Sequence, residues 1–222
     1  MLPFDLDQRE QRDSIQCYTN GFLVYVRNLK CASTFFGSSF EKCWRWEPIL
    51  WRDIDWGTQH VFGHMLDPLE RRFKGLAEYI NMHDLGALFE KDKKFQNFVK
   101  NAVTLDEHTS SYHDTFGNFV YHIDWIPISD YSHEQVIDFT ERLLRQYGIR
   151  TLKNWAYDNV HRTHPEKKAV EQQLKKLCEE QGTWPQTVSW YLERDVALYR
   201  HISNKFNAEG ETWAETTWLR LK

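Results

Sequence analysis

The sequence has few cysteines, and they lack the spacing that binds zinc. Its four cysteines include no CxxC pair; they are Cys17, Cys31, Cys43 and Cys178. Disulfide-stapled domains and zinc knuckles need several cysteines at short, regular intervals. We therefore expect reduced thiols, no metal site and a cytoplasmic protein.

Long apolar runs and an excess of positive charge are also missing. Residues 1–13 are mainly charged and polar, and no apolar segment is long enough to cross a bilayer. The net charge of −4 at pH 7 gives no overall field that would attract nucleic acid. We expect a soluble protein with no membrane or nucleic-acid partner, in which any anion site is local.

The chain also lacks repeats, low-complexity tracts and Pro/Gly/Ser-rich linkers. Its 222 residues, 15% of them aromatic, are enough for one well-packed domain, which we place at residues 1–222. Segments with strand patterns alternate with segments that have helix patterns. This alternation predicts an α/β fold with a mainly parallel sheet flanked by helices and a helical C-terminal third.

Apolar patterns and helix caps locate the expected elements. Strands are expected near residues 22–27, 49–55, 60–65 and 119–128. Asp67 followed by Pro68 predicts the start of a helix that reaches Ile80, and Ser132 with Gln135 predicts a capped helix that ends before Gly148. Further helices are expected near residues 33–44, 91–103, 165–181 and 185–206.

The first chemical signal is the loop that follows the first expected strand. Residues 22–40 read FLVYVRNLKCASTFFGSSF, a β-branched run, a short loop and a helix start. Free N–H groups and the positive dipole end at a helix start bind anions, and the loop adds a lysine and two hydroxyls. We predict that the loop holds a phosphate-like group through Arg27, Asn28, Lys30, Cys31, Ala32, Ser33 and Thr34.

Two observations limit the prediction of a phosphate-binding loop. The loop lacks the GxxxxGK[ST] pattern, which disfavours an ordinary nucleoside-triphosphate P-loop. By local physics alone, a solvated lysine followed by a Ser/Thr helix cap explains the same residues equally well.

Four segments, in order, resemble the PAPS-dependent sulfotransferases (PAPS is 3′-phosphoadenosine-5′-phosphosulfate), specifically a compact soluble member of the carbohydrate type. RNLKCAST resembles the family's 5′-phosphosulfate loop, commonly P-K-x-A-S-T. Residues 67–71, DPLER, resemble its 3′-phosphate segment, R-D-P-x-x-R-x-x-S-x-Y, and Tyr79 lies near the expected aromatic residue. DEHT at 106–109 followed by IDWIPI resembles the middle of these enzymes, and YLERDVALYRHI at 191–202 their closing helix.

The resemblance implies a single P-loop-like three-layer domain that moves a sulfuryl group from PAPS to an acceptor hydroxyl, on a carbohydrate or small molecule, without a metal. It implies that Lys30 neutralises the bridging oxygen of the departing phosphate. Ser33, Thr34 and nearby backbone N–H groups would hold the 5′-phosphate. Such fixed donors suit a reaction in which negative charge develops on oxygen.

The sequence departs from the family at three positions. Leu66 replaces the arginine that begins the 3′-phosphate motif, Lys74 replaces its serine, and Leu29 replaces the proline before the lysine. Substitute cations for the 3′-phosphate are Lys74, Arg72 and Arg71, although lysine lacks the bidentate fork of arginine. The alternative is a solvated helix face, in which Glu70 and Glu78 balance these cations.

The acceptor needs a base within hydrogen-bond reach, and our first choice is His108, because the matching family loop borders the acceptor cleft. Each of the other candidates has a commoner structural role; they are His60, His64, Asp53 and Asp55. His161 and His164 alone do not make a metal site. Basic residues near them would cover the nucleotide or lie at a solvated helix start; they are Arg162, Lys167 and Lys168. Trp44 or Trp56 would stack on an acceptor, or pack in the core.

Two rival functions stay open. One is a catalytically inactive nucleotide- or anion-binding protein of the same fold, which the changes at Leu66 and Lys74 favour. The other is a kinase-like phosphotransferase, which would need a Mg²⁺-binding carboxylate such as Asp53, Asp55 or Asp124.

Overall fold

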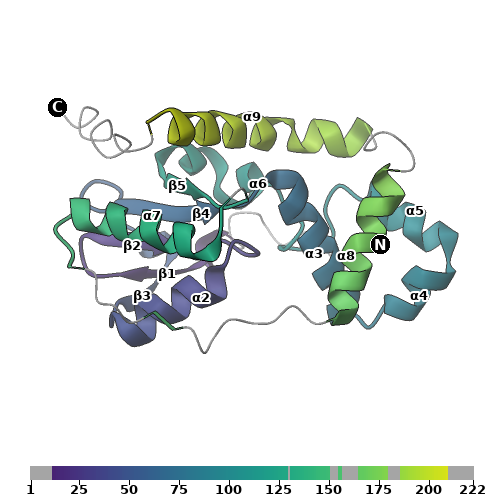
Figure 1. Ribbon diagram of the computed structural model, residues 1–222, viewed down its shortest axis with the longest axis horizontal. Helices are drawn as coiled ribbons and strands as arrows, with labels where there is room; N and C mark the ends of the chain where they lie inside the picture. Colours follow the sequence, from purple (N-terminus) through teal and green to yellow (C-terminus); the bar gives the residue numbers. More distant parts are fainter. Residues whose placement is uncertain (1–11, 130, 151–154, 157–164, 180–185, 210–222) are drawn as a thin grey trace.

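The fold is α/β, built on one five-stranded mixed sheet. The computed structural model describes residues 12–129, 131–150, 155–156, 165–179 and 186–209. The sheet order is β3-β1-β2-β4-β5 (Figure 1). The strands are β1 (Gln16–Thr19), β2 (Leu23–Val26), β3 (Glu47–Leu50), β4 (His60–Met65) and β5 (Asp124–Pro127).

Strand directions agree with the expected mainly parallel sheet, with one exception. β2 pairs parallel with β4, and β4 with β5, whereas β1 pairs antiparallel with both β2 and β3. Four strands therefore point one way and β1 the other. β1 was not predicted, although Asn20-Gly21 is a turn signal: the Asn20 side chain accepts from Phe22 and Leu23, and Gly21 has a φ of 94°.

The two predicted helix caps are confirmed. The Asp67 carboxylate accepts hydrogen bonds from the backbone N–H groups of Leu69 and Glu70, and Ser132 forms the reciprocal capping box with Gln135. The α-helices are α2 (Ser33–Ser38), α3 (Pro68–Met82), α4 (Gly86–Lys91), α5 (Lys93–Asn101), α6 (Tyr112–Phe116), α7 (His133–Gln146), α8 (Pro165–Glu179) and α9 (Gln186–Glu209). Within the described residues, none of these helices has the length and apolar content that a bilayer crossing requires.

Three expected elements differ from those observed. The helix expected near 33–44 begins as α2 and continues as the π-helical η1 (Ser39–Cys43). The helix expected near 91–103 is divided, because Asp92 caps a new helix, α5. The strand expected at 119–128 is reduced to β5, since the residues before it form the 3₁₀ helix η3 (Gly117–His122). Another 3₁₀ turn, η2 (Trp51–Asp53), follows β3.

Both faces of the sheet are buried, which makes this part of the molecule three-layered. Val24 and Val26 of β2 pack in a cluster that includes residues of α6 and α9. Leu23 and Tyr25, which alternate with them, pack in a second cluster with residues of α2 and α7. Figure 1 shows α7 in front of the strands and α9 running along the edge nearest β5.

A third cluster lies among α3, α4, α5 and α8, away from the sheet (Figure 1). Its buried residues include Phe73 and Leu76 of α3, Phe89 of α4 and Leu174 of α8. The loop at the end of β2 lies where this helical region meets the sheet, because it contacts α3.

Candidate functional site

The loop after β2 and the start of α3 meet at the carboxyl edge of the sheet. β2 and β4 are parallel neighbours, so their carboxyl ends lie side by side. The Asn28 side-chain amide donates to the His64 carbonyl oxygen over 2.9 Å, and Arg71 Nε donates to the Leu29 carbonyl oxygen over 3.3 Å. We call the loop 27–34, the segment 66–78 and the loop 102–110 together the Lys30 corner.

The loop after β2 has an unusual backbone. Lys30 and Ala32 have φ values of 64° and 55°, in the left-handed region that non-glycine residues rarely adopt. Ala32 precedes α2 and offers no side-chain cap, while Ser33 is buried and Thr34 half-buried. Left-handed non-glycine residues cost about 1 kcal/mol or more each and cluster at functional sites.

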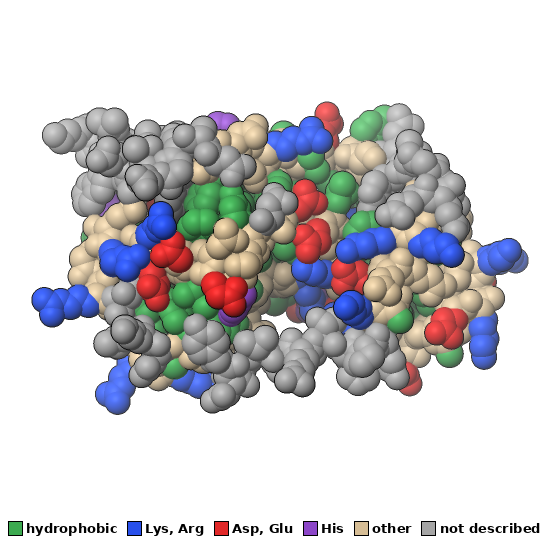
Figure 2. Space-filling view, in the orientation of Figure 1, with side chains coloured by type: hydrophobic (Ala, Val, Ile, Leu, Met, Phe, Trp, Pro, Cys, Tyr) green, Lys and Arg blue, Asp and Glu red, His purple; other side chains and the backbone are tan. Residues whose placement is uncertain are grey.

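Lys30 is held by a carboxylate. Its Nζ lies 3.2 Å from Oε1 of Glu78, and Lys167 of α8 contacts the other carboxylate oxygen. Burial lowers the pKa of Lys30, the Lys167 ammonium lowers it further, and Glu78 opposes both effects. Two ammonium groups, from residues far apart in sequence, thus surround one carboxylate. Figure 2 shows acidic and basic side chains mixed over the middle of this face, where Figure 1 draws α3 and α8.

The two arginines of α3 are buried and bind backbone carbonyls. Arg71 donates to the Leu29 and Ser110 carbonyls, and its guanidinium lies 4.7 Å from the centre of the Tyr112 ring. Arg72 donates to the carbonyls of residues 102 and 103, and burial lowers its pKa to about 10. A solvated helix face is therefore wrong for these two residues. Their guanidinium groups fix the loop 102–110 against α3.

The third substitute cation stays at the surface. Lys74 is half-buried, and its Nζ lies 2.7 Å from Glu70 one turn earlier, as the solvated-face alternative expects. Leu66, which stands at the place of the family arginine, packs in the sheet core with 2% exposure. A core leucine therefore occupies the position at which the family has its arginine.

His108 lies in a loop pressed onto α3. Its Nδ1 is 3.0 Å from an oxygen of Asp106, which assigns the Nδ1 proton to that bond and leaves Nε2 as the acceptor in the neutral ring. The contact with α3 is close, since a Cβ on Gly75 would lie 2.2 Å from the His108 carbonyl oxygen. This arrangement suits a base whose tautomer is fixed.

Tyr112 links the loop after β2 to α6. Its hydroxyl donates to the Leu66 carbonyl over 2.8 Å, accepts from the Leu66 N–H over 3.0 Å, and lies 3.4 Å from the Cys31 sulfur. Burial raises the pKa of the Cys31 thiol, so it is a neutral packing group here. Arg27 turns away and donates to Gln16 of β1.

α9 is anchored to α6 through a buried carboxylate. Asp195, 1% exposed, accepts hydrogen bonds from the backbone N–H groups of Tyr112 and His113 and contacts His113 Nδ1. The closing-helix segment at 191–202 therefore lies against the segment that follows DEHT. Sequence reasoning missed the His113–Asp195 pair, because no local motif joins residues 82 positions apart.

The other histidine candidates have structural contacts. His64 is fully buried, its Nε2 lies 2.9 Å from Thr140 Oγ1, its ring stacks on Phe36, and burial lowers its pKa to about 3. His60 packs against Phe22 and Tyr147. His161, Arg162 and His164 lie outside the described residues, and Lys168 is exposed.

The carboxylates considered for Mg²⁺ lie in other surroundings. Asp124 begins β5, at the edge of the sheet opposite to the Lys30 corner. Asp55 is exposed and accepts from Gly57 and Thr58 in its own turn, and Asp53 is paired weakly with Arg52. Among the described residues, no group of three or more His, Cys, Asp or Glu side chains is placed to hold a metal ion.

The two tryptophans considered as acceptor platforms pack against aromatic neighbours. Trp44 contacts Phe40 and Trp155, and Trp56 contacts Trp51 and Phe119. Trp56 also lines a cavity of about 370 Å³ at the amino ends of β4 and β5. A larger cavity, of about 470 Å³, lies between β5 and α9.

Comparison with protein-family models, with curated proteins and with solved structures finds no significant match to this chain.

Proposed function

We propose that the chain is a PAPS-dependent sulfotransferase, with a P-loop-like three-layer domain and its active site at the Lys30 corner. One observation carries this proposal: all four sequence segments that resemble the family are contiguous in space. The loop 27–34 touches α3, α3 touches the loop 102–110, and α6, which follows that loop, is bonded to α9. The carboxyl edge of parallel strands is also where ligands bind in open α/β sheets, so the arrangement supports a shared site.

The Lys30 corner holds an oxyanion of its own, the Glu78 carboxylate. The Glu78 carboxylate is held between Lys30 and Lys167, so two ammonium groups are placed to hold an oxyanion. PAPS would bring a phosphosulfate and a second phosphate, and its sulfuryl group is the one transferred. In this proposal Glu78 leaves the lysines when the donor binds, and Lys30 stabilises the charge that develops on the departing phosphate.

The remaining roles follow from position. Ser33 and Thr34 begin α2 and would donate to the 5′-phosphate, while Lys74 and Lys167 are the cations that remain for the 3′-phosphate. His108 Nε2 would take the proton of the acceptor hydroxyl as the new oxygen–sulfur bond forms. The acceptor is a carbohydrate or a small hydroxylated molecule.

A second candidate has an observation of its own. Arg71 and Arg72 bind backbone carbonyls, and Leu66 is in the core, so the customary 3′-phosphate contacts are absent at these positions. This favours the alternative of an anion- or nucleotide-binding protein of the same fold without catalysis.

Thermal melting with the desulfated product, 3′-phosphoadenosine-5′-phosphate, tests the shared nucleotide site. Both candidates predict a higher melting temperature, because a ligand that binds only the native state stabilises it by mass action. Adenosine 5′-phosphate is the matched control for the 3′-phosphate and should raise the melting temperature less. No shift at millimolar product would remove the sulfotransferase and any inactive protein that binds its nucleotide, and a shift that requires ATP and Mg²⁺ would favour the kinase-like rival.

Transfer of labelled sulfate from PAPS to a panel of carbohydrates and small alcohols separates the two candidates. Product binding with sulfated acceptor supports the enzyme. Product binding while labelled PAPS stays intact, with no sulfate transferred to an acceptor or to water, supports the inactive protein.

A further inference from the structure

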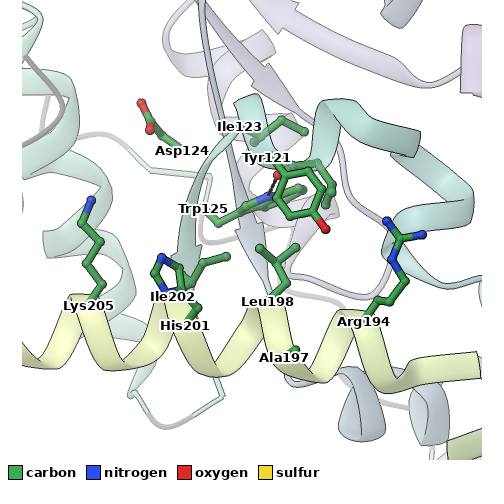
Figure 3. A pocket seen from close by; sticks show the side chains of 11 residues that line it. Tyr121, Ile123, Asp124, Trp125, Arg194, Ala197, Leu198, His201, Ile202 and Lys205 are labelled. Atoms are coloured by element: carbon green, nitrogen blue, oxygen red, sulfur yellow. Dashed lines mark hydrogen bonds between the residues drawn. The ribbon is translucent and has the colours of Figure 1, made fainter. Parts of the chain in front are cut away.

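A second site, independent of the proposed sulfotransferase chemistry, lies beside α9. The cavity of about 470 Å³ is walled by η3 and β5 on one side and by α9 on the other (Figure 3). Its apolar wall includes Ile123 and Trp125 from the sheet side and Leu198 and Ile202 from α9. We call it the α9 pocket. A cavity of this size, with an apolar wall and a few polar groups, is typical of small-molecule sites.

One polar group of the α9 pocket is a tyrosine at the end of a hydrogen-bonded chain. The Tyr121 hydroxyl lies 2.9 Å from His113 Nε2, and Nδ1 of the same ring contacts the buried carboxylate of Asp195. The carboxylate accepts the Nδ1 proton, so Nε2 of the neutral ring accepts and the Tyr121 hydroxyl donates to it. The lone pairs of the Tyr121 oxygen are then left for another donor. Tyr121 is 54% exposed, so a ligand can reach it.

The opposite wall of the α9 pocket carries positive charge. Arg194, His201 and Lys205 lie on the α9 side of the cavity, and Figure 3 shows their side chains rising from one face of the helix. Within the described part of the chain, neither Arg194 nor Lys205 forms an ion pair. The carboxylate among the described lining residues is Asp124, which is hydrogen-bonded to Tyr147.

We propose that the α9 pocket binds a small organic carboxylate with an apolar body and a hydroxyl group. The carboxylate meets Arg194, because a guanidinium without an ion-pair partner binds oxyanions through charge-assisted hydrogen bonds. The apolar body covers the wall formed by Trp125 and Leu198. The ligand hydroxyl donates to the Tyr121 oxygen, whose own proton is held by His113.

Two fluorescent naphthoates that differ by one hydroxyl test this site. For 6-hydroxy-2-naphthoate we expect saturable binding with one molecule per chain, measured by titration calorimetry or ligand fluorescence. Replacing Ala197 with Trp fills the pocket from an exposed position and should weaken binding by about tenfold or more, which corresponds to about 1.4 kcal/mol or more. The matched control is Glu193→Trp, at an exposed α9 position outside the cavity, which should bind as the original chain does.

Separate variants test the positive charge of α9 and the contact between Tyr121 and the ligand hydroxyl. Arg194→Gln should weaken both naphthoates several-fold, whereas Arg200→Gln, an exposed arginine of α9 outside the cavity, should change neither. Tyr121→Phe should weaken 6-hydroxy-2-naphthoate and leave 2-naphthoate unchanged. The proposal is overturned if 6-hydroxy-2-naphthoate does not bind at millimolar concentration, if Ala197→Trp has no effect, or if Arg194→Gln and Arg200→Gln behave alike.

Discussion

In the Lys30 corner the polar side chains bind one another, whereas in the α9 pocket several of them face solvent. The Lys30 side chain is 15% exposed and bound to Glu78, and Arg71 and Arg72 are bound to carbonyls. Tyr121 is more than half exposed, and Arg194 and His201 are exposed. A ligand must therefore displace the Glu78 carboxylate to reach Lys30, whereas Arg194 of the α9 pocket has no ion-pair partner among the described residues. The closed network holds its groups in fixed positions, which catalysis requires, and the open one leaves them free to bind.

The largest effect that would distinguish the two regions is on turnover. If the Lys30 corner is the active site, Lys30→Ala should reduce sulfate transfer from labelled PAPS by about 10² or more, the usual cost of one lost donor to a developing oxyanion. The fold should change little, because Glu78 keeps its contact with Lys167. The control is Lys175→Ala, which removes a lysine paired with a glutamate on α8. Retained turnover in Lys30→Ala would contradict the catalytic role.

A methyl group added at Gly75 tests how tightly the loop 102–110 packs against α3. Gly75→Ala places a Cβ against the His108 carbonyl oxygen, so the loop 102–110 must move away from α3. We expect a loss of about 3 kcal/mol in the free energy of unfolding, the upper part of the range for overpacking. Gly86→Ala, at the start of α4, meets no atom within 4 Å and should be neutral or slightly stabilising. Denaturant unfolding measures both, and equal stabilities would mean that the loop does not press on α3.

The next comparison is between two tyrosines, Tyr112 beside the Lys30 corner and Tyr121 in the α9 pocket, and it concerns the free energy of unfolding. Tyr112→Phe leaves the buried N–H and carbonyl of Leu66 without a partner, and we expect it to cost about 2 kcal/mol of stability. Tyr121→Phe removes a bond at an exposed hydroxyl, and its effect on unfolding should be about 0.5 kcal/mol or less. If both variants unfolded alike, the contrast between a closed corner and an open pocket would be lost.

Sequence reasoning could reach the Lys30 corner because each of its parts is a short continuous segment with its own pattern. RNLKCAST and DPLER each follow a strand, and strand order then brings them together. Capping residues also fixed two helix starts, at Asp67 and Ser132. What the sequence could not supply was the partner of each cation, since the acceptors of Arg71 and Arg72 are backbone carbonyls some 30 to 40 residues away.

Sequence reasoning could not predict the α9 pocket, because its walls come from segments that lie far apart in the chain. Its histidine–aspartate pair joins α6 to α9, and its tyrosine belongs to a 3₁₀ helix that was expected to be a strand. Strand β1 was also missed, because its residues, QCYT, form neither an apolar run nor a clear alternation. Local patterns predict elements, but contacts between distant elements depend on the tertiary fold.

The smallest effect concerns two histidines, the buried His64 and His113, which contacts Tyr121 of the α9 pocket. Burial lowers the pKa of His64 to about 3, from 6.5 in the unfolded chain. Between these values the unfolded state binds the extra proton, so the free energy of unfolding must fall as the pH falls below about 6.5. From pH 6.5 to 5, this residue alone should remove roughly 1 to 2 kcal/mol. His113, in contrast, lies outside the sheet core and contacts the carboxylate of Asp195.

Denaturant unfolding at several pH values separates the two. His64→Gln keeps a polar group that can reach Thr140, and it should unfold with a weaker pH dependence between 6.5 and 5 than the original chain, whatever its stability at pH 7. The matched control is His113→Gln, which removes a histidine outside the sheet core and leaves His64 in place, so the part of the pH dependence that is due to His64 should remain. A His64→Gln curve that runs parallel to that of the original chain would mean that His64 is protonated in the folded protein. The core between β4 and α7 would then hold a charge. The contrast between a buried, uncharged sheet core and an exposed α9 pocket would not stand.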